Sequence, residues 1–107
     1  MLELAATSIA ISQLRKLKSD HPELFSAVST RLQELRVDLG GRYRGRTFLL
    51  DDGSAARLAT IFDVDTSADL AIVWKVELAD GAETGRLFVL RVEFVGSFVP
   101  IRPTLGR

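Results

Sequence analysis

The chain has 107 residues, enough for one compact domain but too few for two separate hydrophobic cores. Its composition, 47% hydrophobic and 26% charged, is ordinary for a globular protein, and 14 basic residues balance 14 acidic ones. Overall charge therefore provides no long-range attraction for nucleic acid or anionic lipid, so either would need a local patch. The absence of cysteine excludes disulfide scaffolds, thiolate zinc sites and cysteine nucleophiles. A single histidine argues against histidine-based metal sites and serine–histidine triads. We expect neither a metal nor a cofactor.

The N-terminal segment does not resemble a secretory signal, because its apolar run is broken at Glu3 and lacks a basic start. No apolar run in the chain approaches the ~20 residues that a membrane-spanning helix needs. We therefore expect a cytoplasmic protein with no membrane partner.

The first part of the chain predicts a brief strand and then a helix. Residues 1–6 are short and apolar, as in a short strand. Thr7 or Ser8 is a candidate cap for a helix that ends near Lys18. Its apolar face is formed at i, i+4 and i+7 by Ala10, Leu14 and Leu17.

A second helix is predicted over residues 22–37. Asp20 and Glu23 have the spacing of a capping box, and Pro22 is tolerated in a first helical turn. An apolar stripe follows, widened by Phe25 and ended by Gly40-Gly41. The stripe consists of Leu24, Val28, Leu32, Leu35 and Leu39. Two helices joined by so short a break predict an antiparallel αα-hairpin.

From Thr47 onward the apolar period changes to two, which predicts strands over residues 47–50, 57–65, 70–79 and 87–95. Turn signals separate them at residues 51–54, 66–69 and 80–85. The predicted inward sets are Leu58, Phe62 and Val64, then Leu70, Ile72, Trp74, Val76 and Leu78, and finally Phe88, Leu90, Val92 and Phe94.

These elements predict an α+β fold with the helical hairpin on one face of a 3–5-stranded antiparallel sheet. We expect a single domain over residues 1–98 and an extended tail over residues 99–107. The helix stripe should pack on Phe62, Trp74 and Phe94, so Trp74 is read as core rather than as a ligand platform.

The solvated face of the sheet is the first candidate site. The residues that face away from the inward sets are Arg57, Lys75, Glu77, Arg91 and Glu93. On three neighbouring strands they would share one surface, where cations hold a phosphodiester and a carboxylate assists proton transfer. The alternative is that Lys75 and Glu77 only form cross-strand ion pairs with Glu93 and Arg91.

The second candidate site is a short basic segment that carries Arg42, Tyr43, Arg44 and Arg46. Arginines around one aromatic ring suit phosphate contacts and the stacking of an unpaired base. The alternative is a solvated loop between helix and sheet. His21 is read as a helix-start residue, and Asp51-Asp52-Gly53 as a turn rather than a calcium loop.

The order of these elements resembles the RelE/ParE toxin superfamily. The segment SQLRKLKSDHPELFSAVSTRLQELR is similar to the family's helical hairpin. GGRYRGRTFLLDDGSAARLATIFDVD is similar to the basic loop and the two strands after it, with Arg57 at the place of the family's arginine. LFVLRVEFVGSF is similar to the final strand, although Ser97-Phe98 stands where the family commonly has a basic residue.

The resemblance implies the toxin component of a type II toxin–antitoxin system, with a cognate antitoxin as partner. Ribosome-dependent mRNA interferases of the family hold RNA with arginines and lysines on the sheet. In that role Arg57 and Arg91 stabilise charge, while Glu77 or Glu93 accepts a proton. Substrate would be bound by Lys75 and by the basic segment, Arg42, Tyr43, Arg44 and Arg46. The alternative is a non-enzymatic protein-binding module of the same fold, either a gyrase-directed ParE-like toxin or an inactive assembly subunit.

Overall fold

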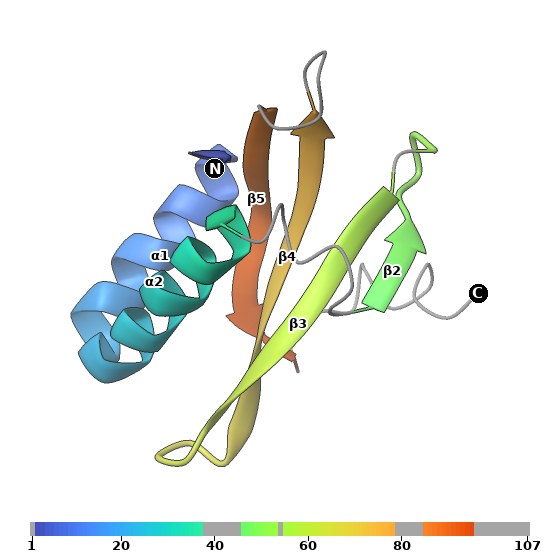
Figure 1. Ribbon diagram of the computed structural model, residues 1–107. Helices are drawn as coiled ribbons and strands as arrows, with labels where there is room; N and C mark the ends of the chain where they lie inside the picture. Colours follow the sequence, from blue (N-terminus) through green and yellow to red (C-terminus); the bar gives the residue numbers. More distant parts are fainter. Residues whose placement is uncertain (1, 38–45, 54, 79–84, 96–107) are drawn as a thin grey trace.

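Two helices and five strands form the part of the chain that the computed structural model describes, residues 2–37, 46–53, 55–78 and 85–95. In chain order they are β1 (Glu3–Ala6), α1 (Ser8–Asp20), α2 (Pro22–Val37), β2 (Arg46–Leu49), β3 (Ala55–Asp63), β4 (Ala68–Leu78) and β5 (Gly85–Phe94). Figure 1 shows both helices side by side on one face of the twisted sheet. The predicted α+β arrangement is confirmed. The predicted tail, the helix end at Gly40-Gly41 and Leu39 lie outside the described residues.

The helical hairpin closes through a single residue. Thr7 caps α1, because its Oγ1 accepts a hydrogen bond of 3.0 Å from the Ala10 amide. The His21 amide donates to Leu17 O at 2.7 Å, and His21 O accepts from the Phe25 amide at 2.9 Å. His21 therefore ends one helix and begins the next. The predicted capping role of Asp20 is wrong, since α1 continues through that residue.

The sheet has the strand order β1-β5-β4-β3-β2. All neighbouring pairs are antiparallel except β1 and β5, which run parallel with Leu4 opposite Leu87. The prediction of a fully antiparallel sheet is therefore wrong at this edge. The apolar pattern of residues 1–6 identifies a strand, but the direction of pairing depends on contacts made more than 80 residues later in the chain.

The main core lies between the helices and the sheet. The predicted stripe of α2 is buried, with Leu24, Val28, Leu32 and Leu35 between 0% and 7% exposed. They share one cluster with Trp74, which is fully buried. The reading of Trp74 as core is confirmed. In the described part of the chain, neither helix is long and apolar enough to cross a membrane.

A β-bulge in β5 changes which of its residues face the helices. Val73 lies opposite Arg91 and Trp74 lies opposite Val89, so Leu90 has no partner in β4. The buried residues before the bulge are therefore Leu87 and Val89, both 0% exposed, rather than the predicted Phe88 and Leu90. After the bulge, Val92 and Phe94 face the main core as predicted.

The two faces of β3 are reversed relative to the prediction. The register pairs Arg57 with Trp74 and Ala59 with Ile72, so these β3 residues lie on the helix side of the sheet. Phe62, predicted to pack under α2, is 60% exposed. Leu58 instead joins a small second cluster on the far side of the sheet, which we call the outer face. That cluster contains Ala56, Ala71 and Val73, with Leu50, Leu58 and Leu90 packed against it.

Candidate functional site

Most of the predicted catalytic residues lie on the outer face, on β4 and β5. The register places Lys75 opposite Phe88 and Glu77 opposite Arg86. Arg86 Nη2 lies 2.6 Å from Glu77 Oε1, and Lys75 Nζ lies 3.7 Å from Glu77 Oε2. Both cations also lie over the Phe88 ring, at 5.6 Å for Lys75 and 5.4 Å for Arg86. Glu77 is therefore held between two cations.

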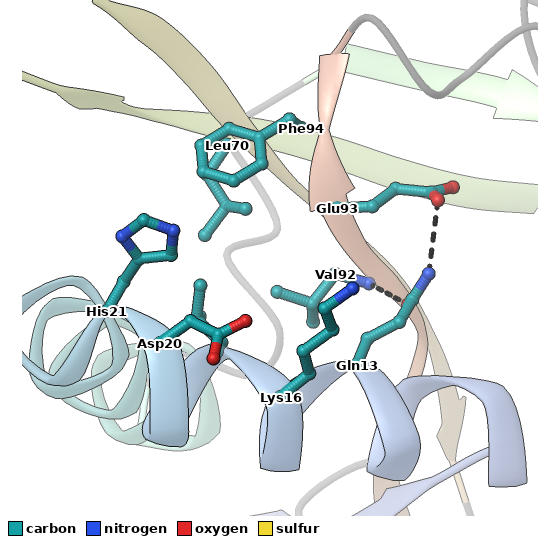
Figure 2. Close-up of a pocket in the computed structure, with 9 residues that line it drawn as sticks. Gln13, Lys16, Asp20, His21, Leu70, Val92, Glu93 and Phe94 are labelled. Atoms are coloured by element: carbon teal, nitrogen blue, oxygen red, sulfur yellow. Dashed lines mark hydrogen bonds between the residues drawn. The ribbon is translucent and has the colours of Figure 1, made fainter. Parts of the chain in front are cut away.

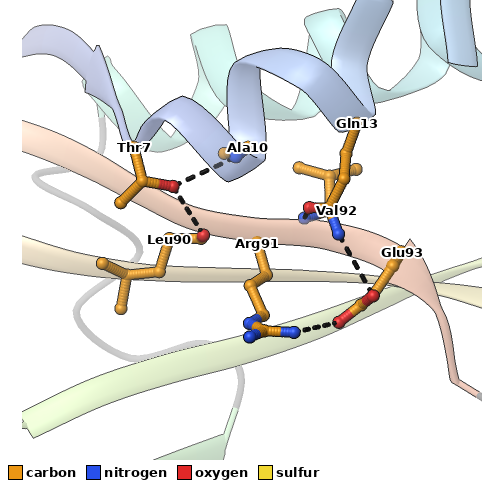
Figure 3. Close-up of polar contacts among 7 residues, drawn as sticks. All are labelled: Thr7, Ala10, Gln13, Leu90, Arg91, Val92 and Glu93. Atoms are coloured by element: carbon orange, nitrogen blue, oxygen red, sulfur yellow. Dashed lines mark hydrogen bonds and ion pairs between the residues drawn. The ribbon is translucent and has the colours of Figure 1, made fainter. Parts of the chain in front are cut away.

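Arg91 and Glu93 form a second charged pair on the same face (Figure 3). Arg91 Nη1 donates to Glu93 Oε1 at 3.0 Å, and Gln13 Nε2 donates to Glu93 Oε2 at 3.1 Å. Gln13 Oε1 in turn accepts from the Val92 amide at 2.8 Å. Both oxygens of the Glu93 carboxylate thus have donors, and α1 holds the pair in place.

Arg57 does not share this surface. Its position opposite Trp74 puts it on the helix side of β3, whereas Lys75, Arg91 and their acidic neighbours lie on the outer face. The predicted constellation is therefore divided between two faces of the sheet. The cause is the sequence of β3, which has apolar side chains at both its odd-numbered and its even-numbered positions. Pairing with β4 places the odd-numbered residues on the helix side, whereas the even-numbered ones were predicted there.

The outer-face charges are already paired in this structure. Three cations, Lys75, Arg86 and Arg91, stand against the carboxylates of Glu77 and Glu93. These residues do form ion pairs, but the expected cross-strand pairs of Lys75 and Glu77 with Glu93 and Arg91 are not among them. Such a surface has little excess field for a polyanion, while its fixed donors and acceptors suit recognition of a polar protein surface.

The basic segment contributes little to the observed site. Arg42, Tyr43 and Arg44 lie outside the described residues, so their predicted contacts are neither supported nor contradicted. Arg46 is the first residue of β2, which is an edge of the sheet, and its backbone pairs in register with Leu58.

A cavity of about 340 Å³ lies between the C-terminal half of α1 and the ends of β4 and β5 (Figure 2). The described residues that line it are Gln13, Lys16, Leu17, Asp20, His21, Leu70, Val92, Glu93 and Phe94. Of these, only Glu93 is among the functional residues predicted from the sequence. In the sequence, the feature that could have indicated this cavity is His21 at the break between the two helices, with Lys16 and Asp20 shortly before it.

The described lining of the cavity holds no cluster of metal-ligating side chains. Among the described residues, no group of three or more acidic or histidine side chains is placed to hold an ion. Its wall is instead partly aromatic, because the His21 and Phe94 rings meet edge to face with centroids 5.9 Å apart.

The chain was compared with family models, with curated proteins and with solved structures, and none of them matched it.

Proposed function

We propose that this chain is the toxin component of a type II toxin–antitoxin pair, similar to RelE/ParE toxins, and that it acts by binding a protein rather than by cutting RNA. The family relationship is supported by the sequence resemblance and by the order of a short strand, a helical hairpin and a four-strand run. The non-enzymatic mode is supported by one observation above all, the position of Arg57 on the helix side of the sheet.

Cleavage of a phosphodiester requires charge-stabilising and proton-accepting groups around the same phosphate. In the interferase hypothesis Arg57 and Arg91 would supply the charge stabilisation. Here the sheet separates their positions, and Glu77 and Glu93 are each engaged with cations. This arrangement favours binding over catalysis.

The partner expected from the resemblance is a cognate antitoxin, and in the non-enzymatic alternative the cellular target is gyrase. The outer face offers a protein partner both polar and apolar contacts. Its charged side chains are held in fixed positions, and Phe62 supplies an exposed aromatic ring at the far end of β3. Aromatic rings and arginines are the side chains that most often anchor protein interfaces.

Inducible expression of the full chain in a bacterial host tests the proposal. We expect growth arrest with a DNA damage response and intact transcripts, and relief by co-expression of the adjacent gene's product. Cleaved transcripts would instead establish the mRNA interferase alternative. Normal growth at full expression of folded protein would overturn the toxin assignment itself.

Two sets of variants separate binding from cleavage. If the protein is not a nuclease, Arg57→Ala should retain growth arrest. Replacing Arg42, Arg44 and Arg46 together by Gln should leave ribosome binding unchanged in affinity and in salt dependence. If the basic segment contacts phosphates, the triple variant will bind ribosomes more weakly, and its affinity will depend less steeply on salt concentration. The reason is that fewer phosphate contacts release fewer counterions on binding.

A further inference from the structure

The cavity beside α1 has a preformed apolar floor. Leu17, Leu70 and Val92 are 6%, 1% and 3% exposed and belong to the main core, so their positions are fixed by packing. The edge-to-face pair of His21 and Phe94 forms an aromatic wall beside them. Because about 340 Å³ of space lies beside these side chains, an apolar group can enter without rearrangement of the fold.

One side of the cavity is polar but already satisfied. Gln13 uses its carbonyl oxygen on the Val92 amide and its amide nitrogen on Glu93. The other oxygen of Glu93 accepts from Arg91. These groups shape the wall, and their mutual hydrogen bonds leave them little capacity to select a ligand by charge.

The mouth of the cavity carries two charged side chains, Lys16 and Asp20. Lys16 and Asp20 are exposed, and neither has a hydrogen-bond or ion-pair partner among the described residues. Figure 2 shows both side chains rising from the cavity side of α1. They stand four residues apart on the helix, which places their Cβ atoms about 5–6 Å from each other. One cation and one anion thus flank an apolar recess.

We propose that this cavity binds a zwitterionic small molecule with an apolar side chain, of the class of large neutral α-amino acids. The ligand's carboxylate lies toward Lys16, its ammonium toward Asp20, and its side chain against Leu17, Leu70 and Phe94. A ligand with a single charge is disfavoured, because a carboxylate alone meets Asp20 and an amine alone meets Lys16. The volume of about 340 Å³ is near the lower limit of the ~300–1,000 Å³ typical of small-molecule sites, which suits a single amino acid better than a nucleotide.

Titration of the full chain with L-phenylalanine, followed by amide chemical shifts and calorimetry, tests this site. Two further probes separate the charges: 3-phenylpropionate carries only the carboxylate and phenethylamine only the ammonium. We expect millimolar or tighter binding of L-phenylalanine, with shifts confined to the second half of α1 and the ends of β4 and β5. Each singly charged probe should bind at least about tenfold more weakly. Equal binding of either probe, or no saturable shift with L-phenylalanine, would overturn the proposal.

Substitutions at the cavity mouth locate the charges. Lys16→Gln and Asp20→Asn should each weaken L-phenylalanine binding severalfold while the thermal melt stays unchanged, since both side chains are exposed. The matched controls are Arg31→Gln and Glu34→Gln, which remove one cation or one anion from an exposed pair on α2, away from the cavity. Unchanged affinity in both mouth variants, or an equal loss in the controls, would contradict the assignment.

Discussion

At the scale of single residues, the side chains of Thr7, which caps α1, and of Gln13, within α1, take the place of a neighbouring strand along the edge of β5. β1 pairs only with residues 86–89 of β5. Beyond it, Thr7 Oγ1 donates to Leu90 O at 2.9 Å, and Gln13 Oε1 accepts from the Val92 amide. Figure 3 shows the Thr7 contact at Leu90, the unpaired residue of the bulge, and Figure 2 shows the Gln13 contact at Val92. Side chains thus satisfy backbone groups that a longer β1 would have paired.

The variant Gln13→Ala tests whether the Gln13 side chain stabilises the edge of β5. Loss of the amide leaves the Val92 N–H without its acceptor, so we expect the free energy of unfolding to fall by about 1–3 kcal/mol. Urea denaturation measures the change. Gln33→Ala is the matched control, because that amide only accepts from Arg36 on an exposed part of α2 and its loss should stay within about 0.5 kcal/mol. Equal losses for the two variants would contradict the role of Gln13.

At the scale of elements, the bulge in β5 reverses the burial of two adjacent residues. Val89 is fully buried in the main core, while Phe88 lies on the outer face beneath two cations. The same strand can therefore bury Leu87 and Val89 before the bulge and Val92 and Phe94 after it.

Because of the bulge, we expect opposite effects on stability when Asp replaces either of two neighbouring residues, Phe88 and Val89. Val89→Asp places an unpaired carboxylate in the core and should leave little folded protein, at a cost of several kcal/mol, about 3–5. Phe88→Asp places the carboxylate near Lys75 and Arg86 and should cost about 1–2 kcal/mol of packing. Circular dichroism during thermal melting distinguishes the two. A strand without the bulge would give the reverse order.

The helical hairpin depends on the buried stripe of α2. Leu32 is 4% exposed, so Leu32→Asp removes apolar burial and introduces an unpaired charge. We expect a loss of about 3–5 kcal/mol, comparable to the whole stability of a small domain. Gln33→Asp, one residue along the same helix, should melt close to the parent. A cooperative melt of Leu32→Asp at the parental temperature would refute the packing of helices on sheet.

At the scale of the whole molecule, one cluster joins both helices to the sheet. Leu17 of α1, Leu32 of α2 and Trp74 of β4 belong to the same core. Trp74 is the only tryptophan, and it is fully buried at the centre of that core. Its fluorescence therefore reports on the packing of the sheet, while the circular dichroism signal at helical wavelengths reports mainly on α1 and α2.

We expect these two signals to change together during urea unfolding. Neither the helical hairpin nor the sheet retains a covered apolar face without the other, so unfolding should be a single two-state transition. Coincident midpoints for fluorescence and circular dichroism check this. Loss of the helical signal before the fluorescence change would mean that the sheet is stable alone, with its outer-face cluster as an independent core.

The sequence alone determined the helices, their faces and the core role of Trp74. Thr7 marks the start of α1, and in α2 and β4 only one set of positions is continuously apolar. The sequence also placed Lys75, Glu77, Arg91 and Glu93 on one face, because the residues between them, Val76 and Val92, are apolar and face the core.

Tertiary structure decided the rest. A period of two separates the sides of a strand but does not say which side faces the helices, and β3 has apolar residues on both. Pairing with β4 therefore moved Arg57 to the helix side, and the unpaired Leu90 reversed the first half of β5. The direction of β1 and the cavity at His21 likewise depend on segments distant in the chain. Local patterns cannot encode such positions, because they arise only when the sheet register is set.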